Sequence, residues 1–318
     1  MAYYLGIDLG GTNIAAAVTD EMGNILGRSR LDTPLGCWEV IADGVAQAAR
    51  LAAEAAGTPL SAITAVGAGI PGSVAPELGL VRYACNISME NCPLGEALSQ
   101  RLDGLPVLLE NDANAAALGE YAAGAGKGVR SMILVTLGTG VGGGIILDGK
   151  LYTGCNHTGG ELGHFVIRRD GLPCACGRRG CFEQYASATA LLRETRAMMA
   201  RLPSSLCWTL CGDDLAQVNG RVPFDAARQG DPGAREVVDA YLADLADGLT
   251  SLVNLFQPEL LCLGGGVAGQ GDALLPPLQA VMDQEDYARN CPRRTRLAIA
   301  RLGNDAGLVG AALMERFR

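Results

Sequence analysis

The segment LGIDLGGTNI, residues 5–14, places an aspartate and a Gly-Gly-Thr turn directly after an apolar run. A second copy of this pattern, VTLGTGVGGG, occupies residues 135–144, at about half-chain distance. In both copies an apolar strand, a glycine turn and another apolar strand follow one another. We therefore expect an α/β chain of two related lobes facing a cleft, each with a turn of backbone N–H groups suited to an anion.

Apolar periodicity predicts the other main elements. Strands are expected over residues 3–9, 13–19, 25–31, 63–68, 106–109, 132–137, 143–147, 150–153 and 260–263. Four helices are expected. The first has apolar helical spacing from Ile41 and stops at Gly57, the second covers 113–123, the third has such spacing from Val238 to Phe256, and the last begins at 306. We place the lobe boundary near Ala115, which gives an N-terminal lobe of residues 1–115 and a C-terminal lobe of residues 116–303.

The charge balance excludes several classes of partner. The 318 residues carry 25 Lys and Arg against 34 Asp and Glu, a net charge of −9. Such a field repels nucleic-acid phosphates and anionic lipid surfaces, so neither nucleic acid nor membrane is expected as a partner. No apolar run reaches the length of a membrane helix.

The N-terminus and the cysteines indicate the compartment. The first residues lack a basic region and carry Asp8 within their only apolar stretch, unlike a signal peptide. We expect a cytoplasmic protein. In a reducing compartment, 11 cysteines indicate buried thiols and a metal site rather than a disulfide framework.

The first glycine turn is a candidate phosphate site. Gly10 and Gly11 would let the backbone approach phosphate, with Thr12 and Asn13 beside them, and Asp8 could hold a hydrated Mg²⁺. The alternative is an ordinary hairpin turn with Asp8 as a turn residue. The matching turn at Gly138, Thr139 and Gly140 favours phosphate, and the Walker and dinucleotide-binding motifs are absent.

Glu110-Asn111-Asp112 stands at a predicted junction between a strand and a helix. Functional groups of α/β proteins gather at such junctions. Asp112 is a candidate general base that takes a proton from a hydroxyl nucleophile. The alternative, which is favoured for such a residue taken alone, is an N-cap for the alanine-rich helix, and the two roles are compatible.

The most specific pattern lies between Gly154 and Glu183. It combines histidine with Cys-x-Cys-x₄-Cys, whose glycines permit a tight knuckle. One histidine and three cysteines close a tetrahedral zinc site with protein ligands alone, so this Zn²⁺ would be structural. Glu161 and Glu183 flank the knuckle and suit sugar hydroxyls, or else are solvated surface acids. His157 is left without a role, either in the same loop or as a structural histidine.

Taken in order along essentially the whole chain, these motifs resemble the ROK family of repressors, open reading frames and kinases, specifically its glucokinase-like sugar kinases. The motifs are Asp8-x-Gly-Gly-Thr-Asn13, Gly69-Ile-Pro-Gly72, Glu110-Asn-Asp112, Leu137-Gly-Thr-Gly-Val-Gly-Gly143, Gly160-Glu-Leu-Gly-His164, Cys174-x-Cys-Gly-x-x-Gly-Cys181-x-Glu183 and Gly264-Gly-Gly266. The resemblance implies an α/β, actin-like ATPase fold of two ribonuclease-H-like lobes around a nucleotide and sugar cleft. It also implies that the terminal helix, 304–318, crosses back to the first lobe.

The resemblance also assigns roles. It makes Asp112 the catalytic base and assigns zinc to His164, Cys174, Cys176 and Cys181. It assigns sugar binding to Asn111, Glu161, His164, Glu183, Gly69, Pro71 and Gly72. ATP with Mg²⁺ would use Asp8, Gly10, Gly11, Thr12, Asn13, Gly138, Thr139 and Gly140, with Gly264, Gly265 and Gly266 near the adenosine. A homodimer or larger homo-oligomer is expected.

The expected activity is phosphorylation of the 6-hydroxyl of an aldohexose, foremost glucose, as in glycolysis. N-acetylmannosamine, allose or fructose are alternative substrates, polyphosphate is an alternative donor, and a catalytically silent sugar sensor is the alternative class. Two departures from the family stand out. Gly159 replaces a more usual alanine, which could loosen the sugar loop, and the first turn begins at residue 8, where repressors carry a preceding winged-helix domain.

Overall fold

The protein is described by a computed structural model that covers residues 2–317. The chain forms two compact units. Unit 1 comprises Met1–Leu134, Gly143–Gly160 and Arg301–Arg318, and unit 2 comprises Val135–Gly142 and Glu161–Ala300. Ala115, the predicted lobe boundary, lies inside a helix of unit 1, so compact units and predicted lobes divide the chain differently, and the lobes stay a prediction.

Unit 1 is built on a five-stranded sheet of order β3-β2-β1-β4-β8. Its strands are β1 (Tyr3–Leu9), β2 (Asn13–Asp20), β3 (Ile25–Asp32), β4 (Ile63–Ile70) and β8 (Val107–Asn111). The first three strands form an antiparallel meander, while β4 and β8 run parallel to β1. The apolar runs of β1 and β4 are almost wholly buried, as expected for strands covered on both faces.

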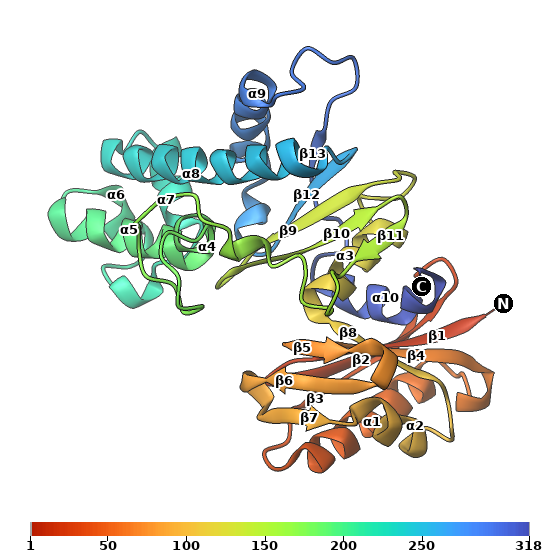
Figure 1. Ribbon diagram of the computed structural model, residues 1–318. Coiled ribbons are helices and arrows are strands. Elements are labelled where there is room, and N and C mark those ends of the chain that lie inside the picture. The colour runs from red at the N-terminus through yellow and green to blue at the C-terminus, as the bar shows by residue number, and fades with distance from the viewer. Residues whose placement is uncertain (1, 318) are drawn as a thin grey trace. The chain divides into compact units, whose positions relative to one another are not determined.

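Helices cover both faces of this sheet (Figure 1). On one face, α1 (Trp38–Ala55) and α2 (Leu94–Arg101) pack on Leu5, Ile7 and Leu9. On the other face lie α3 (Asp112–Ala122) and the terminal helix α10 (Ala306–Leu313). α10 approaches closely because a Cβ at Gly67 would lie only 1.9 Å from the carbonyl oxygen of Ala311.

A buried carboxylate fixes the C-terminal segment within unit 1. Glu120, near the end of α3, is fully buried. Its two oxygens accept hydrogen bonds from the backbone N–H groups of Ala125 (2.9 Å), Arg301 (3.0 Å) and Leu302 (2.6 Å). A buried carboxylate is tolerated when backbone donors satisfy it in this way. Glu120 therefore connects α3 to the chain that enters α10.

Unit 1 also contains a three-stranded antiparallel sheet that the sequence analysis did not predict. Its strands are β5 (Ser73–Ala75), β6 (Leu80–Ala84) and β7 (Met89–Cys92). The 3₁₀ turns of the chain are η1 (Leu60–Ala62), η2 (Pro76–Leu78), η3 (Cys85–Ile87), η4 (Leu162–His164), η5 (Leu215–Gln217), η6 (Val267–Ala273), η7 (Gly303–Asp305) and η8 (Met314–Phe317).

The second five-stranded sheet has the order β11-β10-β9-β12-β13. Its strands are β9 (Met132–Leu137), β10 (Val141–Leu147), β11 (Lys150–Tyr152), β12 (Leu260–Gly264) and β13 (Arg296–Ile299). The neighbours β10 and β11 are antiparallel, and β12 and β13 are parallel. The strand order therefore repeats that of the first sheet, as the repeated glycine-turn pattern predicted.

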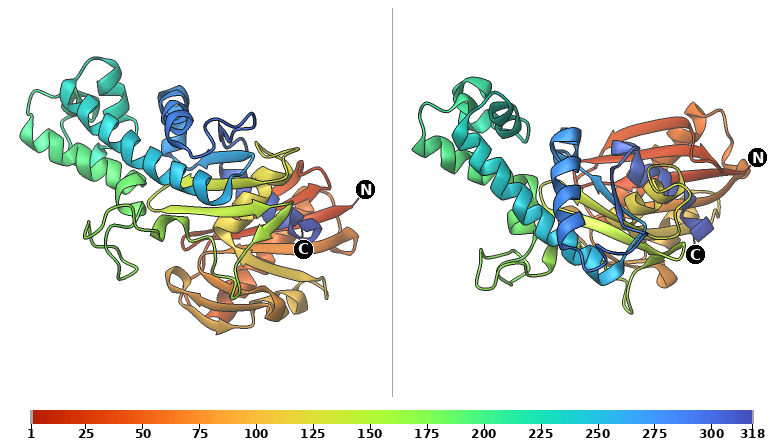
Figure 2. Two further views of the ribbon diagram at one scale, coloured as in Figure 1. Left: turned by 45° about the horizontal axis from the view of Figure 1, so that its top comes forward. Right: turned by 90° about the horizontal axis from the view of Figure 1, so that it is seen from above.

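Most helices of unit 2 gather around α8 (Pro232–Phe256), with α6 and α7 toward its N-terminal end (Figure 2). The others are α4 (Glu183–Ala186), α5 (Ala188–Arg201), α6 (Leu206–Leu210), α7 (Val222–Arg228) and α9 (Leu275–Glu285). Asp231 caps α8 and accepts from the N–H of Ala234 (2.8 Å) and the hydroxyl of Ser205 (2.7 Å). Burial opposes its charge, but these hydrogen bonds prevail and lower the pKa of Asp231.

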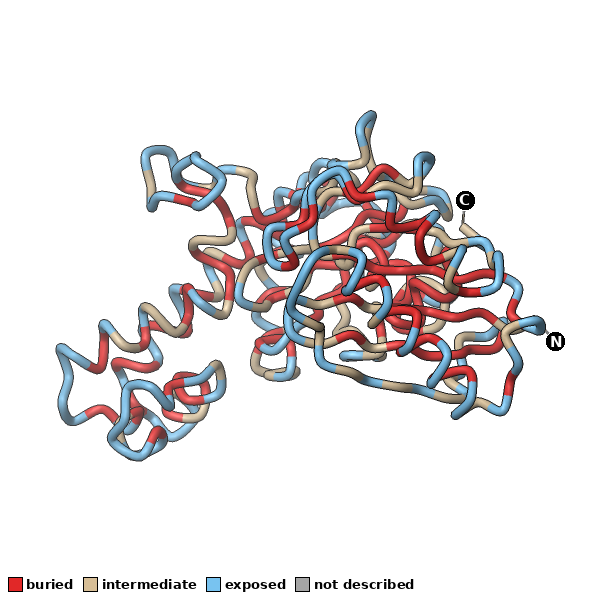
Figure 3. The backbone as a smooth tube through the Cα atoms, turned by 90° about the horizontal axis from the view of Figure 1, so that it is seen from below, coloured by how far each residue is buried: buried red, intermediate tan, exposed pale blue. Residues whose placement is uncertain are grey.

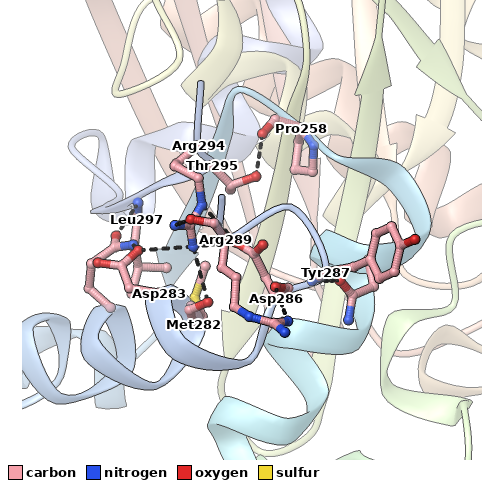
Figure 4. Close-up of polar contacts among 11 residues, drawn as sticks. Pro258, Met282, Asp283, Asp286, Tyr287, Arg289, Arg294, Thr295 and Leu297 are labelled. Atoms are coloured by element: carbon pink, nitrogen blue, oxygen red, sulfur yellow. Dashed lines mark hydrogen bonds and ion pairs between the residues drawn. The ribbon is translucent and has the colours of Figure 1, made fainter. Parts of the chain in front are cut away.

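The connection between α9 and β13 is held by an arginine (Figure 4). A nitrogen of Arg294 lies 2.6 Å from an oxygen of Asp286, whose side chain is 2% exposed, and 3.4 Å from Asp283. Another nitrogen of Arg294 donates to the carbonyl of Arg289 at 2.7 Å. These bonds tie an irregular segment to the end of α9.

Buried residues follow the strands, and exposed residues are concentrated in the connecting loops (Figure 3). Among residues 2–317, no helix combines the length and apolar character needed to cross a membrane.

Candidate active site

The carboxyl ends of three parallel strands bring the unit 1 candidates into one row. Asp8 of β1 pairs with Gly69 of β4, and Gly69 pairs with Glu110 of β8. Asn111 and Asp112 follow at the same edge, where α3 begins. Ligand-binding groups of parallel α/β sheets gather at this edge. The structure thus brings together Asp8, the 69–72 turn and Asp112 at one edge of the sheet.

Two hydrogen bonds fix the first glycine turn. The N–H of Gly10 donates to the carbonyl of Asn13 (2.8 Å), and the hydroxyl of Thr33 donates to the carbonyl of Gly10 (2.7 Å). Gly11 and Thr12, at the tip, are exposed. Thr33 was not identified from the sequence because its role depends on how β3 returns beside the turn.

Asp8 lies partly buried at the end of β1, opposite the first turn of α10, where a Cβ at Gly307 would be 3.5 Å from its Oδ2. Burial raises the pKa of Asp8 above its usual value. A carboxylate whose charge is disfavoured by burial is stabilised by a bound cation. This environment suits the Mg²⁺ that the sequence analysis assigned to Asp8.

The structure corrects one alternative at the start of α3, because the N-cap is Asn111 and not Asp112. The Oδ1 of Asn111 accepts from the N–H groups of Ala113 (2.9 Å) and Asn114 (3.3 Å). The helix begins at Asp112, one residue earlier than predicted, so the cap falls on Asn111, the last residue of β8. Asp112 is the first helical residue, and its Oδ1 accepts from the N–H of Ala113 at 2.8 Å.

Asn111 also fixes the 69–72 turn. Its Nδ2 donates to the carbonyl of Gly72 at 3.1 Å. One N–H of the amide is thus used within the protein, and a second remains on the same nitrogen. Asn111 can therefore contact a sugar hydroxyl while it caps α3.

In unit 2 the second glycine turn is bound to the residues that follow the knuckle. The N–H of Ala188 donates to the carbonyl of Gly138 (2.8 Å), and the hydroxyl of Thr189 donates to the carbonyl of Thr139 (2.7 Å). The N–H of Val141 donates to Oε2 of Glu183 at 3.1 Å. A Cβ at Gly140 would lie 2.2 Å from that oxygen, so this contact requires glycine.

The 264–266 segment begins at the last residue of β12 and lies beside the same turn. Gly265 has φ +84°, and a Cβ there would lie 2.5 Å from the carbonyl oxygen of Leu137, the residue before Gly138. Two of the predicted nucleotide segments, Gly138–Gly140 and Gly264–Gly266, are therefore neighbours within unit 2.

The four predicted zinc ligands form one cluster in unit 2. The ligand atoms of His164, Cys174, Cys176 and Cys181 all lie within 4.8 Å of one another. His164 Nδ1 is 3.6 Å from the sulfur of Cys174, and the sulfurs of Cys176 and Cys181 are 3.6 Å apart. Thiolates bound to one tetrahedral zinc at about 2.3 Å would be about 3.8 Å apart. The residues present therefore fit the metal.

The thiols of this cluster differ in their surroundings. A hydrogen bond from the backbone of Arg178 lowers the pKa of Cys176, whereas burial raises the pKa of Cys181 to about 12. A coordinated divalent metal deprotonates a thiol outright, so the two pKa values apply to the cluster without its metal. The irregular segment 165–181 that carries the cysteines has no helix or strand of its own, as the green loops of Figure 2 show.

The carboxylates and histidines around the cluster have distinct environments. Glu183 Oε1 lies 3.9 Å from the sulfur of Cys174, so one side chain connects the metal cluster to the second glycine turn. Glu161 is exposed at the start of η4. His157 lies outside the cluster, in unit 1, where its Nε2 contacts Glu77. The sequence analysis had left His157 open.

Residues 4–316 match the ROK family. The chain is 43% identical to the glucokinase of Streptomyces coelicolor over 99% of this chain and 98% of that protein, and 38% identical to that of Thermotoga maritima over 99% and 97%. A crystal structure of a ROK family glucokinase from Streptomyces griseus, in complex with glucose and AMPPNP, is similar with a TM-score of 0.81 at 39% identity, covering 98% of this chain and 99% of that one.

The two sheets, their glycine turns and this similarity define the fold as that of the actin-like ATPases. Within this class, the chain belongs to the ROK family.

Proposed function

We propose that the protein is a glucokinase that transfers the γ-phosphoryl group of ATP to the 6-hydroxyl of glucose. The observation that carries the proposal is the row of residues at the carboxyl edge of the unit 1 sheet. Asp8 of β1 and Glu110 of β8 are in register through Gly69 of β4, and Asp112 follows two residues after Glu110. The full-length similarity to proteins named glucokinase supports the same substrate.

Asp112 acts as the general base in this proposal. It takes the proton of the 6-hydroxyl as that oxygen bonds to the γ-phosphorus, while the bond from the γ-phosphorus to the bridging oxygen breaks and ADP leaves with the electron pair. The hydrogen bond from Ala113 and the adjacent cap at Asn111 fix the start of α3, and with it the direction of the carboxylate. Orientation of this kind is the main contribution of a kinase to phosphoryl transfer.

The backbone N–H groups of the two glycine turns are suited to negative charge on the phosphates. Gly11 and Thr12 supply them in unit 1, and Thr139 and Gly140 supply them in unit 2. Asp8 would hold Mg²⁺, which neutralises charge on the phosphate oxygens. Gly264 to Gly266, beside Leu137, would contact the adenosine.

Zinc would be held by His164, Cys174, Cys176 and Cys181 as a structural ion. Its three cysteine ligands lie on the 165–181 segment, which has no helix or strand of its own, so the metal would fix the residues between them. Zinc bound through Nδ1 of His164, the atom that faces Cys174, leaves Nε2 to donate to a sugar hydroxyl. Glu161 and Glu183 would accept hydrogen bonds from other hydroxyls.

A panel of hexoses tests the proposal. ADP release is measured with ATP and glucose, N-acetylmannosamine, allose or fructose, and then with polyphosphate in place of ATP. We expect glucose with ATP to give the highest kcat/KM. No ADP release with any hexose, together with tight sugar binding by calorimetry, would instead establish a sugar sensor. Light scattering on the same protein measures whether it forms the expected homo-oligomer.

A further inference from the structure

A loop of unit 1 leads directly into the proposed sugar-binding residues. Residues 153–160 form this loop, and Glu161 is the next residue along the chain. The N–H of Gly159 donates to the carbonyl of Thr153 at 2.8 Å and closes the loop at its base. The hydroxyl of Thr158 donates to Asn156 at 2.8 Å. Both bonds lie within the loop and do not hold it to the rest of unit 1.

His157 makes a contact outside the loop. Its Nε2 lies against Oε1 of Glu77 in η2, and its Nδ1 is 3.3 Å from the hydroxyl oxygen of Thr153. When Nε2–H donates to the carboxylate, Nδ1 accepts the hydrogen bond of the hydroxyl. The imidazole therefore bridges the base of the loop and η2.

The backbone conformation of His157 carries a steric cost, which the bridge to Glu77 offsets. His157 has φ +61°, in the left-handed region where a side chain is disfavoured and glycine is not. At Gly159, in contrast, a Cβ would lie 2.9 Å from the backbone of both Thr153 and Gly154, so the alanine more usual in the family does not fit this loop. The loop accepts a side chain at 157, where it reaches Glu77, and excludes one at 159.

Part of the His157 side chain faces a cavity. His157, Thr153 and Glu77 line this cavity of about 380 Å³ together with Leu109, Leu118 and Phe317. A side chain over a cavity gains little from van der Waals contact on that side. On the side that faces the cavity, His157 therefore depends on its polar contacts with Glu77 and Thr153.

We propose that His157 is a positioning residue for sugar binding, which holds the 153–160 loop to η2 through Glu77 and so sets the position from which the chain continues into Glu161. This inference rests on the proposed sugar-kinase function. Neither His157 nor Glu77 belongs to the residues assigned to the nucleotide or to proton transfer. Their loss acts on the binding of sugar and leaves the transfer step intact.

A double-mutant cycle tests the contact. His157→Gly suits the positive φ and removes the imidazole, and Glu77→Ala removes an exposed partner, so both variants should fold. We expect each to raise the KM for glucose about two- to fivefold, with kcat and the KM for ATP nearly unchanged. The double variant should be no worse than either single variant, because both remove one contact. Arg130→Gln, which breaks the exposed pair with Asp148, is the matched control and should leave the KM unchanged.

Hydrogen exchange of the sugar-free proteins gives an independent measurement. Amides of residues 153–160 should exchange faster in both single variants than in the parent, and not in Arg130→Gln. An unchanged KM for glucose, or effects of the two substitutions that simply add, would overturn the proposal. If the parent phosphorylates no hexose, the proposed function fails, and unchanged exchange in the loop would separately refute its attachment through His157.

Discussion

Asp112→Asn separates the catalytic role of Asp112 from its structural surroundings. The cap of α3 belongs to Asn111, whose two hydrogen bonds the substitution does not touch. The oxygen of an asparagine at 112 can still accept from the N–H of Ala113, now 2.8 Å from Oδ1. We therefore expect the free energy of unfolding to change by less than about 0.5 kcal/mol.

The effect on turnover should be far larger. Loss of a general base costs about 10²–10⁴-fold in kcat, which corresponds to about 3–5 kcal/mol in the barrier. The affinity for glucose should change much less, because the amide keeps the size and polarity of the side chain. Asn111→Ala provides the structural comparison, since removal of the cap should cost about 1 kcal/mol of stability.

Three measurements on purified Asp112→Asn decide the matter. They are steady-state ADP release, titration of glucose by calorimetry, and urea unfolding. A kcat within tenfold of the parent would show that another group is the base. A loss of stability as large as that of Asn111→Ala would show that Asp112 supports the helix after all.

The remaining predictions concern the metal and the stability of unit 2. Elemental analysis should find one zinc per chain, and Cys176→Ser or strong chelation should lower the melting temperature and weaken glucose binding together; well under one zinc in fresh protein would contradict this. Asp231→Asn should cost about 2 kcal/mol at pH 7. Because folding lowers the pKa of Asp231, its contribution is present above the usual value near 3.8 and is lost as the pH falls through the folded value, so a cost that stays constant down to pH 2 would refute the assignment. Arg294→Ala should cost about 3 kcal/mol in urea unfolding, since Asp286 would remain buried without its cation, whereas the exposed Arg130→Gln should cost less than about 0.5 kcal/mol.

Local patterns in the sequence were enough to predict the strands that carry the site. The limits of β1 and β9 coincide with the predicted ranges. Those of the other predicted strands differ by one or two residues, at one end or, for β8, at both ends. Apolar runs bounded by glycine turns define such strands without reference to the rest of the chain. The short strands β5, β6 and β7 have no comparable run, because polar residues interrupt them, and they were missed.

Contacts between distant residues could not be predicted in the same way. Asn111 and Asp112 are both good capping residues, and only the observed end of β8 decides between them. In the sequence, Glu120 does not differ from any other acidic residue of a helix. Its role depends on a distant segment, because the N–H of Arg301 donates to its carboxylate. His157 likewise had no role in the sequence, because its partner Glu77 lies in a turn far away along the chain.

Phosphorus and carbon NMR of one reaction mixture tests the central claim most directly. The parent protein is incubated with ATP, Mg²⁺ and ¹³C-labelled glucose, and the product is identified without a coupling enzyme. We predict one new phosphomonoester signal, with phosphorus coupling to carbon 6 of glucose, and one ADP for each sugar phosphorylated. A phosphate on another carbon, or ADP formed with inorganic phosphate and unchanged glucose, would contradict the account.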